Sequence, residues 1–309
     1  GGALLNWNLW RTFKLKFTNQ KYIYYWLIQS NSILQEKGTG STFKAISKDI
    51  INNHPVHLPP INTQEEIVGE LDGINEGIEL KRKQLSELDA LAQSIFYETF
   101  GDIVDNPMGW PICKLDDVSE RISNGSGAKI EKDTYKSEGI MFFRCQNVWR
   151  NRIDFSDMAY IDEATNLKMG SSRLKHNDLL VTKIGRLFTE NSSLGRVALY
   201  EGPDNAANLS GNLSYIRLKK SVNPKFILFI LISDYFRDYV RNTTTGGIDK
   251  RALNNSQLKA LKIFLPPMEM QERFAEQIEA IEREKANVEA CISELQTLLD
   301  SRMDYWFND

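Results

Sequence analysis

The sequence predicts an α+β protein that combines a mixed α/β domain with two long helices forming an antiparallel coiled coil. Three observations carry this prediction: an internal repeat, a narrow apolar seam in each copy of it, and a segment between the copies in which short strand-like and loop-like pieces alternate. The predicted parts are residues 1–63, 64–102, 103–264 and 265–309. A length of 309 residues with 41% hydrophobic residues fits a globular chain that buries a core.

The repeat is an ungapped recurrence at an offset of 207 residues. Residues 58–102 align with residues 265–309, and thirteen of the 45 positions are identical. Each copy opens with Leu-Pro-Pro, which sets an extended approach and then lets a helix begin. The chain is therefore expected to contain two related helices. In the first copy the identical positions are Leu58, Pro59, Pro60, Gln64, Glu65, Ile74, Ser86, Glu87, Leu88, Leu91, Ser94, Phe100 and Asp102.

Each predicted helix carries one narrow apolar seam with alternating spacings of four and three residues. One lysine interrupts each seam, Lys81 in the first copy and Lys285 in the second. A single seam implies a single partner helix, and the simplest arrangement pairs the two helices within the chain. The predicted seam residues are Ile67, Leu71, Ile74, Ile78, Leu85, Leu88, Ile95, Phe274, Ile278, Ile281, Val288, Ile292, Leu295 and Leu299.

Charge alternates along the chain, although the net charge is only −3. Residues 1–63 hold 7 basic and 2 acidic residues, and residues 103–268 hold 24 and 18. Residues 64–102 hold 3 basic and 10 acidic residues, and residues 269–309 hold 4 and 11. Two basic segments thus alternate with two acidic ones, which keeps nucleic-acid binding open despite the negative sum.

A related globular segment precedes each predicted helix. Gly40–Leu58 aligns with Gly247–Leu265 at the same offset. The second globular segment has 162 residues, whereas only 57 residues precede Leu58. Residues 1–63 are therefore expected to be the C-terminal remnant of a first domain, and the opening Gly-Gly-Ala is expected to be a cut or engineered end.

This order of parts resembles the DNA specificity subunit of type I restriction-modification systems. The shared pattern is a globular segment, then Leu-Pro-Pro-x-x-x-Gln-Glu before an acidic helix that ends near Phe-Gly-Asp, and then a second such pair. Phe100-Gly101-Asp102 matches that helix end, whereas Phe307-Asn308-Asp309 lacks the glycine. The resemblance covers nearly the whole chain and depends on the order of the repeats. The truncated first domain departs from the family pattern.

The resemblance implies target-recognition domains that each read half of a bipartite site in double-stranded DNA, and a helix pair that docks methyltransferase subunits. A restriction subunit with translocase and endonuclease activity is a further implied partner. The chain itself is expected to be non-catalytic and to bind no cofactor, with S-adenosylmethionine in the methyltransferase subunit. The remnant is expected to add nonspecific attraction to DNA through Arg11, Lys14, Lys16, Lys21, Lys37, Lys44 and Lys48.

Four polar loops of the second domain, residues 123–129, 144–152, 182–196 and 242–251, carry side chains that bond phosphates or base edges, and three of them also contain glycine. In the richest loop, Gln146 and Asn147 carry the donor–acceptor pair that reads adenine. Its neighbour Cys145 is expected to be a core residue of a strand over Met141–Val148, and Trp149 to be a packed aromatic in preference to a stacking platform. The predicted DNA-binding residues are Asn124, Ser126, Lys129, Arg144, Gln146, Asn147, Arg150, Arg152, Lys183, Arg186, Asn191, Arg196, Thr245, Lys250 and Arg251.

Other features argue against catalysis and against a membrane location. His54, His57 and His176 form no acid–base constellation, and neither Pro-Pro pair follows an Asn or Asp as base-amine methylation requires. No run of about 18 apolar residues appears. Three widely spaced cysteines fit a reducing cytoplasm and oppose a disulfide framework or a metal site.

Three alternatives remain open from the sequence. The first is the specificity module of a fused restriction enzyme, and the second is a half-length version that dimerises. The third is a coiled-coil scaffold whose globular part binds protein. Salt-sensitive binding to duplex DNA separates the first two from the third.

Overall fold

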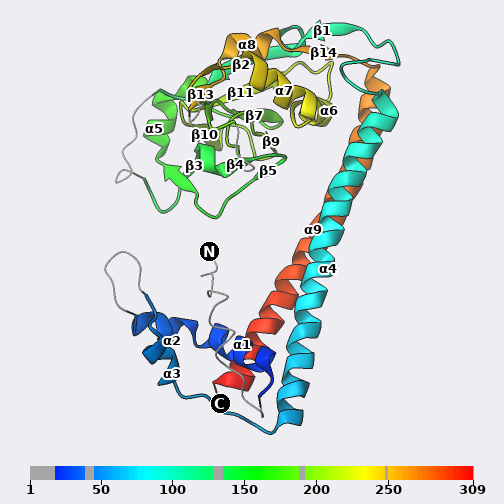
Figure 1. Cartoon of the computed structure of the whole chain (residues 1–309). Coiled ribbons are helices and arrows are strands. Elements are labelled where there is room, and N and C mark those ends of the chain that lie inside the picture. The colour runs from blue at the N-terminus through cyan, green and yellow to red at the C-terminus, as the bar shows by residue number, and fades with distance from the viewer. Residues whose placement is uncertain (1–17, 39–44, 128–134, 188–191, 248–249, 309) are drawn as a thin grey trace. The chain divides into compact units, whose positions relative to one another are not determined.

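The computed structural model describes residues 18–38, 45–127, 135–187, 192–247 and 250–308. The chain divides into two compact units, one of residues 1–89 and 283–309 and the other of residues 90–282. The predicted combination of mixed α and β structure with two long helices is confirmed (Figure 1). These helices, α4 (Ile61–Phe100) and α9 (Met268–Phe307), each run through both units, whereas the predicted boundaries had made each helix a separate part.

The two helices pair antiparallel. Within the first unit, Arg302 contacts Glu70, and Lys285 Nζ lies 2.5 Å from Asp89 Oδ1, so a later residue of α9 meets an earlier residue of α4. Lys285, which interrupts the apolar seam, thus reaches an acidic partner on the other helix. Lys81, the other interruption, donates to Gln84 Oε1 at 3.1 Å.

Most of the predicted seam is covered, as the helix pairing requires. Its buried members are Ile67, Leu71, Ile78, Phe274, Ile278, Ile281 and Val288. Its half-buried members are Ile74, Leu85, Leu88, Ile95, Ile292, Leu295 and Leu299.

Each Leu-Pro-Pro turn is locked by the glutamine that follows it in the repeat. In the second unit, Gln271 Oε1 accepts from Asn223 N at 2.9 Å and Gln271 Nε2 donates to Pro266 O at 2.8 Å. In the first unit, Gln64 makes the same pair of bonds to Asn19 N and Pro59 O, at 2.9 and 2.7 Å. Both side chains are 1% exposed. The repeated motif therefore ties the start of each long helix to the cap of the helix in its own globular segment.

An aromatic junction surrounds the start of α9 in the second unit. Phe96 and Phe100, from the end of α4, contact Phe226 of helix α6 (Pro224–Leu231) and Phe274 of α9, with ring centroids 4.9 to 6.0 Å apart. All of these rings are buried. The end of one long helix and the start of the other therefore share one core with α6.

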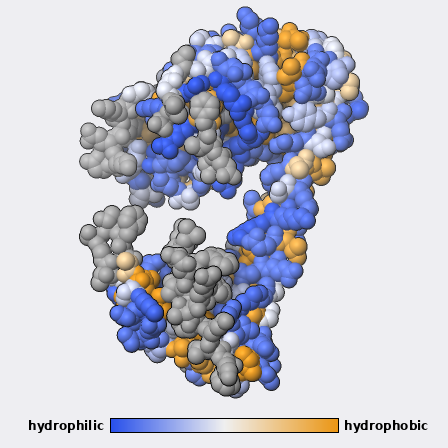
Figure 2. Space-filling model, in the orientation of Figure 1, coloured by the Kyte–Doolittle hydropathy of each residue, from blue (hydrophilic) through white to orange (hydrophobic). Residues whose placement is uncertain are grey.

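The first unit repeats this junction with equivalent residues. Met303 and Phe307, from the end of α9, pack with Tyr22 of α1 (Gln20–Gln29) and Ile67 of α4. Met303, Phe307 and Ile67 occupy the repeat positions of Phe96, Phe100 and Phe274, and Tyr22 matches Phe226 at an offset of 204 residues. The short helices α2 (Asn31–Glu36) and α3 (Lys48–Asn52) complete the described part of this unit, and hydrophobic residues gather over α1–α3 on the face shown in Figure 2.

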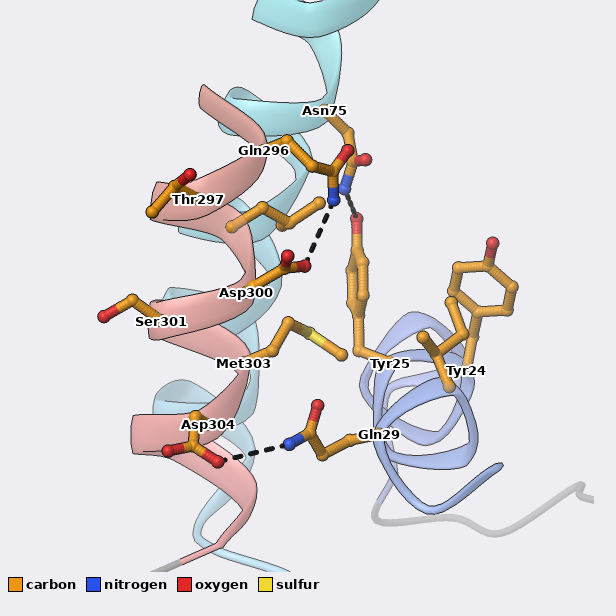
Figure 3. Close-up of a pocket in the computed structure, with 12 residues that line it drawn as sticks. Tyr24, Tyr25, Gln29, Asn75, Gln296, Thr297, Asp300, Ser301, Met303 and Asp304 are labelled. Carbon is orange, nitrogen blue, oxygen red and sulfur yellow. Dashed lines mark hydrogen bonds between the residues drawn. The ribbon is translucent and has the colours of Figure 1, made fainter. Parts of the chain in front are cut away.

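A hollow in the first unit lies between α1 and the paired long helices (Figure 3). Tyr25 OH donates to Asp72 Oδ1 at 2.8 Å and accepts from Asn75 Nδ2 at 3.1 Å, and Gln29 Nε2 lies 3.5 Å from Asp304 Oδ1. Burial, with Asp72 adding to it, raises the pKa of Tyr25. This polar contact fixes α1 to α4.

A four-stranded antiparallel sheet of order β2-β11-β7-β9 forms the centre of the second unit. Its strands are β2 (Ser119–Asn124), β7 (Asp178–Thr182), β9 (Val197–Tyr200) and β11 (Leu213–Leu218). Helix α6 packs on β7 and β9, and the adjoining helix is α7 (Asp234–Thr243). The side chains of α6 from Phe226 to Leu231 are buried, which explains why this is the most apolar stretch of the sequence.

Smaller sheets flank the central one. A three-stranded sheet has the order β10-β3-β6, with β10 parallel to β3 and β6 antiparallel to it, and another has the order β12-β13-β8. Two-stranded pairs are β1-β14 and β4-β5. The remaining elements are β1 (Ile112–Lys114), β3 (Ile140–Phe143), β4 (Val148–Trp149), β5 (Arg152–Ile153), β6 (Ala159–Ile161), α5 (Glu163–Lys168), β8 (Ile184–Gly185), β10 (Ala207–Leu209), β12 (Thr245–Gly246), β13 (Arg251–Ala252), α8 (Asn255–Ala260) and β14 (Lys262–Phe264).

Candidate nucleic-acid interface

Loops from distant parts of the sequence meet around the turn 210–212 of the second unit. The carbonyl oxygen of Asn212 accepts from Lys183 N at 3.0 Å and lies 3.5 Å from Cys145 Sγ. Ser126 forms a parallel bridge with Ser210. We call the loop residues 124–127, 144–146, 183–187, 210–212 and 250–251 the rim. The turn 210–212 is a component that the sequence analysis missed, although its Ser-Gly-Asn composition is typical of a polar turn.

Two glycines allow the loops of the rim to approach so closely. A Cβ atom on Gly125 would lie 2.1 Å from Ser210 O, and one on Gly185 would lie 2.2 Å from Ser193 Oγ. No side chain fits at either position without movement of the neighbouring loop. The glycines of the predicted polar loops thus serve loop-to-loop packing.

Lys183 and Asn124 lie together on the rim. Lys183 Nζ donates to Asn124 Oδ1 at 2.6 Å, and Asn124 ends strand β2 opposite Ser214. Burial lowers the pKa of the Lys183 ammonium, because desolvation disfavours its charged form. An anionic ligand beside this ammonium would relieve that cost.

The strand pairing of β8 with β13 brings two further predicted loops together. Gly185 is opposite Arg251, so exposed Arg186 and exposed Lys250 flank one short sheet. Arg251 Nη1 donates to the carbonyl oxygens of Arg241 and Thr244 at 3.1 and 3.3 Å. Arg251 therefore holds the end of α7 in place, and Arg186 and Lys250 are the more accessible cations.

The prediction that Asn147 reads adenine is wrong for the structure described. Its side chain is 1% exposed and is fully engaged within its own loop. Asn147 Oδ1 accepts from Arg144 N at 2.9 Å, and Nδ2 donates to Asp154 O at 3.0 Å and Asp157 O at 2.9 Å. An asparagine that caps a turn and one that reads a base look alike in sequence, since both need the same donor and acceptor.

Asp157 organises the exposed part of the same loop. Arg144 Nη2 lies 2.9 Å from Asp157 Oδ1, and Gln146 Nε2 donates to Asp157 Oδ2 at 2.9 Å. The Arg144 side chain is only 16% exposed, whereas Gln146 is exposed. Of the two residues predicted to read adenine, Gln146 is exposed and Asn147 is buried.

The strand predicted over Met141–Val148 is also corrected. Strand β3 ends at Phe143, and Cys145–Asn147 form a short 3-10 helix. The Asn147 cap on Arg144 N turns the chain there, which ends the strand. Cys145 packs at the edge of the core, and burial raises its pKa.

Trp149 forms part of a second basic feature. The guanidinium carbon of Arg196 lies 3.8 Å from the Trp149 ring centroid, and that of Arg152 lies 5.8 Å from it. Trp149 Nε1 donates to Gln146 O at 3.0 Å, so a hydrogen bond and two nearby cations hold the ring, and the predicted packed role is consistent with these contacts. Burial lowers the pKa of Arg196.

Arg150 extends this feature toward α7. It donates to the carbonyl oxygen of Ile232 and lies 3.9 Å from Asp234. With Arg196 and two residues of α7, Arg237 and Arg241, it lines a hollow of about 580 Å³ that we call the arginine groove. Arg237 and Arg241 were not predicted as DNA-binding residues, although their four-residue spacing places both on one helix face.

Several predicted residues receive no structural account. Lys129 and Asn191 lie outside the described residues, as do Arg11, Lys14, Lys16 and Lys44 of the remnant, and the side chain of Thr245 is not described.

Over the described ranges, no group of three or more His, Cys, Asp or Glu is arranged to hold a metal ion. Among the same residues, no helix has the length and apolarity that crossing a membrane requires.

Comparison with known proteins connects this geometry to a family. The family model described as the type I restriction modification DNA specificity domain matches residues 7–90 and 107–296. The chain belongs to this family. The resemblance drawn from the repeat is thereby confirmed.

Named relatives agree with this family. The chain is 28% identical over 175 residues to the putative type I restriction enzyme MjaX specificity subunit of Methanocaldococcus jannaschii, covering 56% of this chain and 40% of that protein. It is 21% identical over 305 residues to the MjaVIII specificity subunit of the same organism, covering 93% and 70%. The chain thus spans only part of the length of the relatives it matches.

A solved structure shares the fold. The crystal structure of a type I restriction-modification S subunit from M. genitalium aligns with a TM-score of 0.55 at 11% identity. The alignment covers 93% of this chain and 72% of that one. At this identity the structural similarity shows a shared fold, and any functional inference has to come from the residues of this chain.

Proposed function

We propose that this chain is a non-catalytic component that recognises a short sequence in double-stranded DNA for a type I restriction-modification complex. The observation that supports this most is the convergence of five polar loop segments at the rim, in a chain that belongs to a DNA specificity family. Polar side chains on loops carried by a packed sheet suit base recognition, since the sheet fixes where each loop lies.

The rim and the arginine groove have different tasks in this proposal. Gln146, Arg186 and Lys250 are exposed on the rim and present donors and acceptors suited to base edges. Arg150, Arg237 and Arg241 supply charge without a base-specific geometry, which suits the phosphate backbone. DNA contacts through these loops require no bound cofactor, and S-adenosylmethionine belongs to the methyltransferase subunit.

The proposed partners are methyltransferase subunits and, through them, the restriction subunit of the same cytoplasmic complex. Both long helices are acidic, which makes them unsuited to DNA and available for protein docking. The second globular part of the chain supplies the DNA contacts, and the remnant supplies weak attraction at most.

The test measures duplex binding over a range of salt concentrations with rim and groove variants. Arg186→Ala with Lys250→Ala should weaken binding to the selected sequence by about 1–3 kcal/mol and change binding to random duplex little. Arg237→Ala with Arg241→Ala should weaken both duplexes and flatten the salt dependence. Lys262→Ala, an exposed cation on β14, is the control and should change neither.

Equal losses on selected and random duplex for every rim substitution would show that the rim only positions the backbone. An absence of salt-sensitive duplex binding by the unaltered chain would favour the protein-scaffold alternative.

A further inference from the structure

An exposed carboxylate contacts the rim, in a place where a DNA-binding surface would be expected to carry none. The Asp157 side chain is 72% exposed. A carboxylate there repels the phosphates of DNA, so its presence calls for a compensating role. One of its oxygens, Oδ1, lies 2.9 Å from Arg144 Nη2, and the other, Oδ2, accepts from Gln146 Nε2 at 2.9 Å. These contacts connect the role of Asp157 to Gln146.

The backbone of Asp157 is held from inside the same loop. Its carbonyl oxygen accepts from Asn147 Nδ2 at 2.9 Å and from Arg144 Nη2 at 2.5 Å. Asn147 is 1% exposed and the Arg144 side chain is 16% exposed, so both donors are packed against the fold. The Asp157 carboxylate is therefore an acceptor of fixed position, and Arg144 offsets its charge.

Gln146 is held at two points, although it is exposed. Its backbone carbonyl accepts from Trp149 Nε1 at 3.0 Å, and its side-chain nitrogen donates to Asp157. An exposed glutamine populates several rotamers, and ordering one of them costs free energy when a ligand binds. These two contacts order Gln146 before a ligand arrives, as accurate contact with a ligand requires.

The charge of Asp157 decides which way the Gln146 amide points. An ionised carboxylate has acceptors only, so the amide must turn its nitrogen toward Asp157. The amide oxygen Oε1 then points away from Asp157. One acceptor, Oε1, and one donor, the second N–H of Nε2, are thus left for a ligand.

Adenine matches this acceptor and donor, and guanine does not. The major-groove edge of adenine offers the N6 amino group as donor and N7 as acceptor. Guanine offers N7 and O6, which are both acceptors, so its O6 would face Oε1 and the two oxygens would repel. An amide that could turn over would present its nitrogen to O6 and accept guanine. A fixed amide orientation therefore separates the two purines.

We propose that Asp157 is a specificity-determining positioning residue that makes Gln146 select adenine over guanine at one position of the DNA site. Asp157 acts through Gln146 and touches no base, so its role rests on the proposed recognition of DNA by the rim. Arg144 belongs to the same positioning arrangement, since its guanidinium contacts both the carboxylate and the carbonyl oxygen of Asp157.

The test is a binding selection on randomised duplex with the full chain and three folded variants. Gln146→Ala identifies the position that Gln146 reads, as the one position whose base preference disappears. There the unaltered chain should prefer adenine to guanine at least about tenfold. Asp157→Asn should lower this ratio at least about fivefold, because an asparagine can also donate to Oε1 and lets the Gln146 amide turn over.

Asp154→Asn is the matched control. It removes one negative charge from the same loop, and the Asp154 side chain bonds Ser156 instead of Gln146. This variant should keep the preference for adenine, and both aspartate variants should bind random duplex as tightly as the unaltered chain or slightly more tightly. Thermal unfolding followed by circular dichroism checks that each variant is folded.

An unchanged ratio of adenine to guanine in folded Asp157→Asn would overturn the role of Asp157 and leave the proposed function standing. A loss of preference at several positions together would do the same, because it would mean that Asp157 only stabilises the loop. A chain that selects a sequence but whose Gln146 position is absent, or prefers another base, would also overturn it. Enrichment of no base by the unaltered chain would overturn both the role of Asp157 and the proposed function.

Discussion

Gln64 and Gln271 explain at the level of single residues why the repeat preserves Leu-Pro-Pro followed by glutamine. A helix start leaves backbone N–H groups without partners, and the carbonyl of the first proline in each Leu-Pro-Pro lies before the long helix and outside its hydrogen-bond ladder. Each glutamine side chain supplies one acceptor and one donor to these groups while almost wholly buried. The motif is therefore a structural clamp that joins a long helix to a globular segment.

Replacing the clamp should lower stability without touching the rim. Gln271→Ala leaves the half-buried Asn223 N and the buried Pro266 O without partners, which should lower the free energy of unfolding by about 1–3 kcal/mol. Gln277→Ala, on the exposed side of the same helix, is the matched control and should change it by less than about 0.5 kcal/mol. Urea unfolding monitored by circular dichroism measures the free energy of unfolding of both variants. Equal losses for Gln271→Ala and Gln277→Ala would show that the two clamp hydrogen bonds do not stabilise the fold.

The sequence did not distinguish exposed from buried polar residues within one loop. Gln146 and Asn147 are adjacent and chemically similar, yet one is exposed and the other caps a turn. The difference arises from Asp154 and Asp157, whose backbone carbonyls fold back over Asn147. Composition identified the loop, but a contact across ten residues decided which side chain faces solvent.

The paired helices show, at the scale of elements, where sequence patterns are most informative. A seam with period near 3.5 residues specifies which side of each helix is covered, so the covered face of each helix was predictable. The arginine groove was not, because Arg150, Arg196 and Arg237 come from three separate elements. Their proximity depends on the packing of α6 and α7 against the sheet, which no local pattern encodes.

One polar bridge across the helix pair should make the first unit sensitive to acid. Arg302 and Trp306 bond Glu70 and hold the pKa of that carboxyl below its ordinary value of 4.5. A depressed folded-state pKa means that the stabilisation is present above about pH 4.5 and is lost as the pH falls through the folded-state value. The Glu70 and Arg302 side chains are 34% and 29% exposed, so solvent screening makes the effect modest.

Glu70→Gln removes this pH-dependent part. The unaltered chain should melt at a higher temperature than the variant at pH 7, and the difference should shrink toward pH 3. Thermal unfolding at a series of pH values measures it. Glu79→Gln, in an exposed pair with Arg82, is the control and should show a smaller difference. A melting difference that grows as the pH falls would contradict the assigned role of Glu70.

For the whole molecule, the repeat predicted the order of the helices and globular segments but not the boundaries of the compact units. Each helix was expected to be a separate part, but Phe96 and Phe100 at the end of α4 belong to the core that holds Phe226 and Phe274. Sequence boundaries follow changes in composition, whereas structural units follow packing. The end of α4 therefore belongs to the helix by sequence and to the second unit by packing.

The proposed function assigns DNA sequence recognition to the rim of the second globular part of this chain. The most direct measurement is a binding selection on randomised duplex with the 309-residue chain, with and without the methyltransferase subunit. One short block of enriched bases is expected, because residues 1–63 align only with the closing part of the second globular segment and hold no counterpart of the rim loops 124–127, 144–146 and 183–187. Recovery of duplexes with no enriched bases, or of two blocks separated by an unspecified spacer from a monomeric chain, would contradict this account.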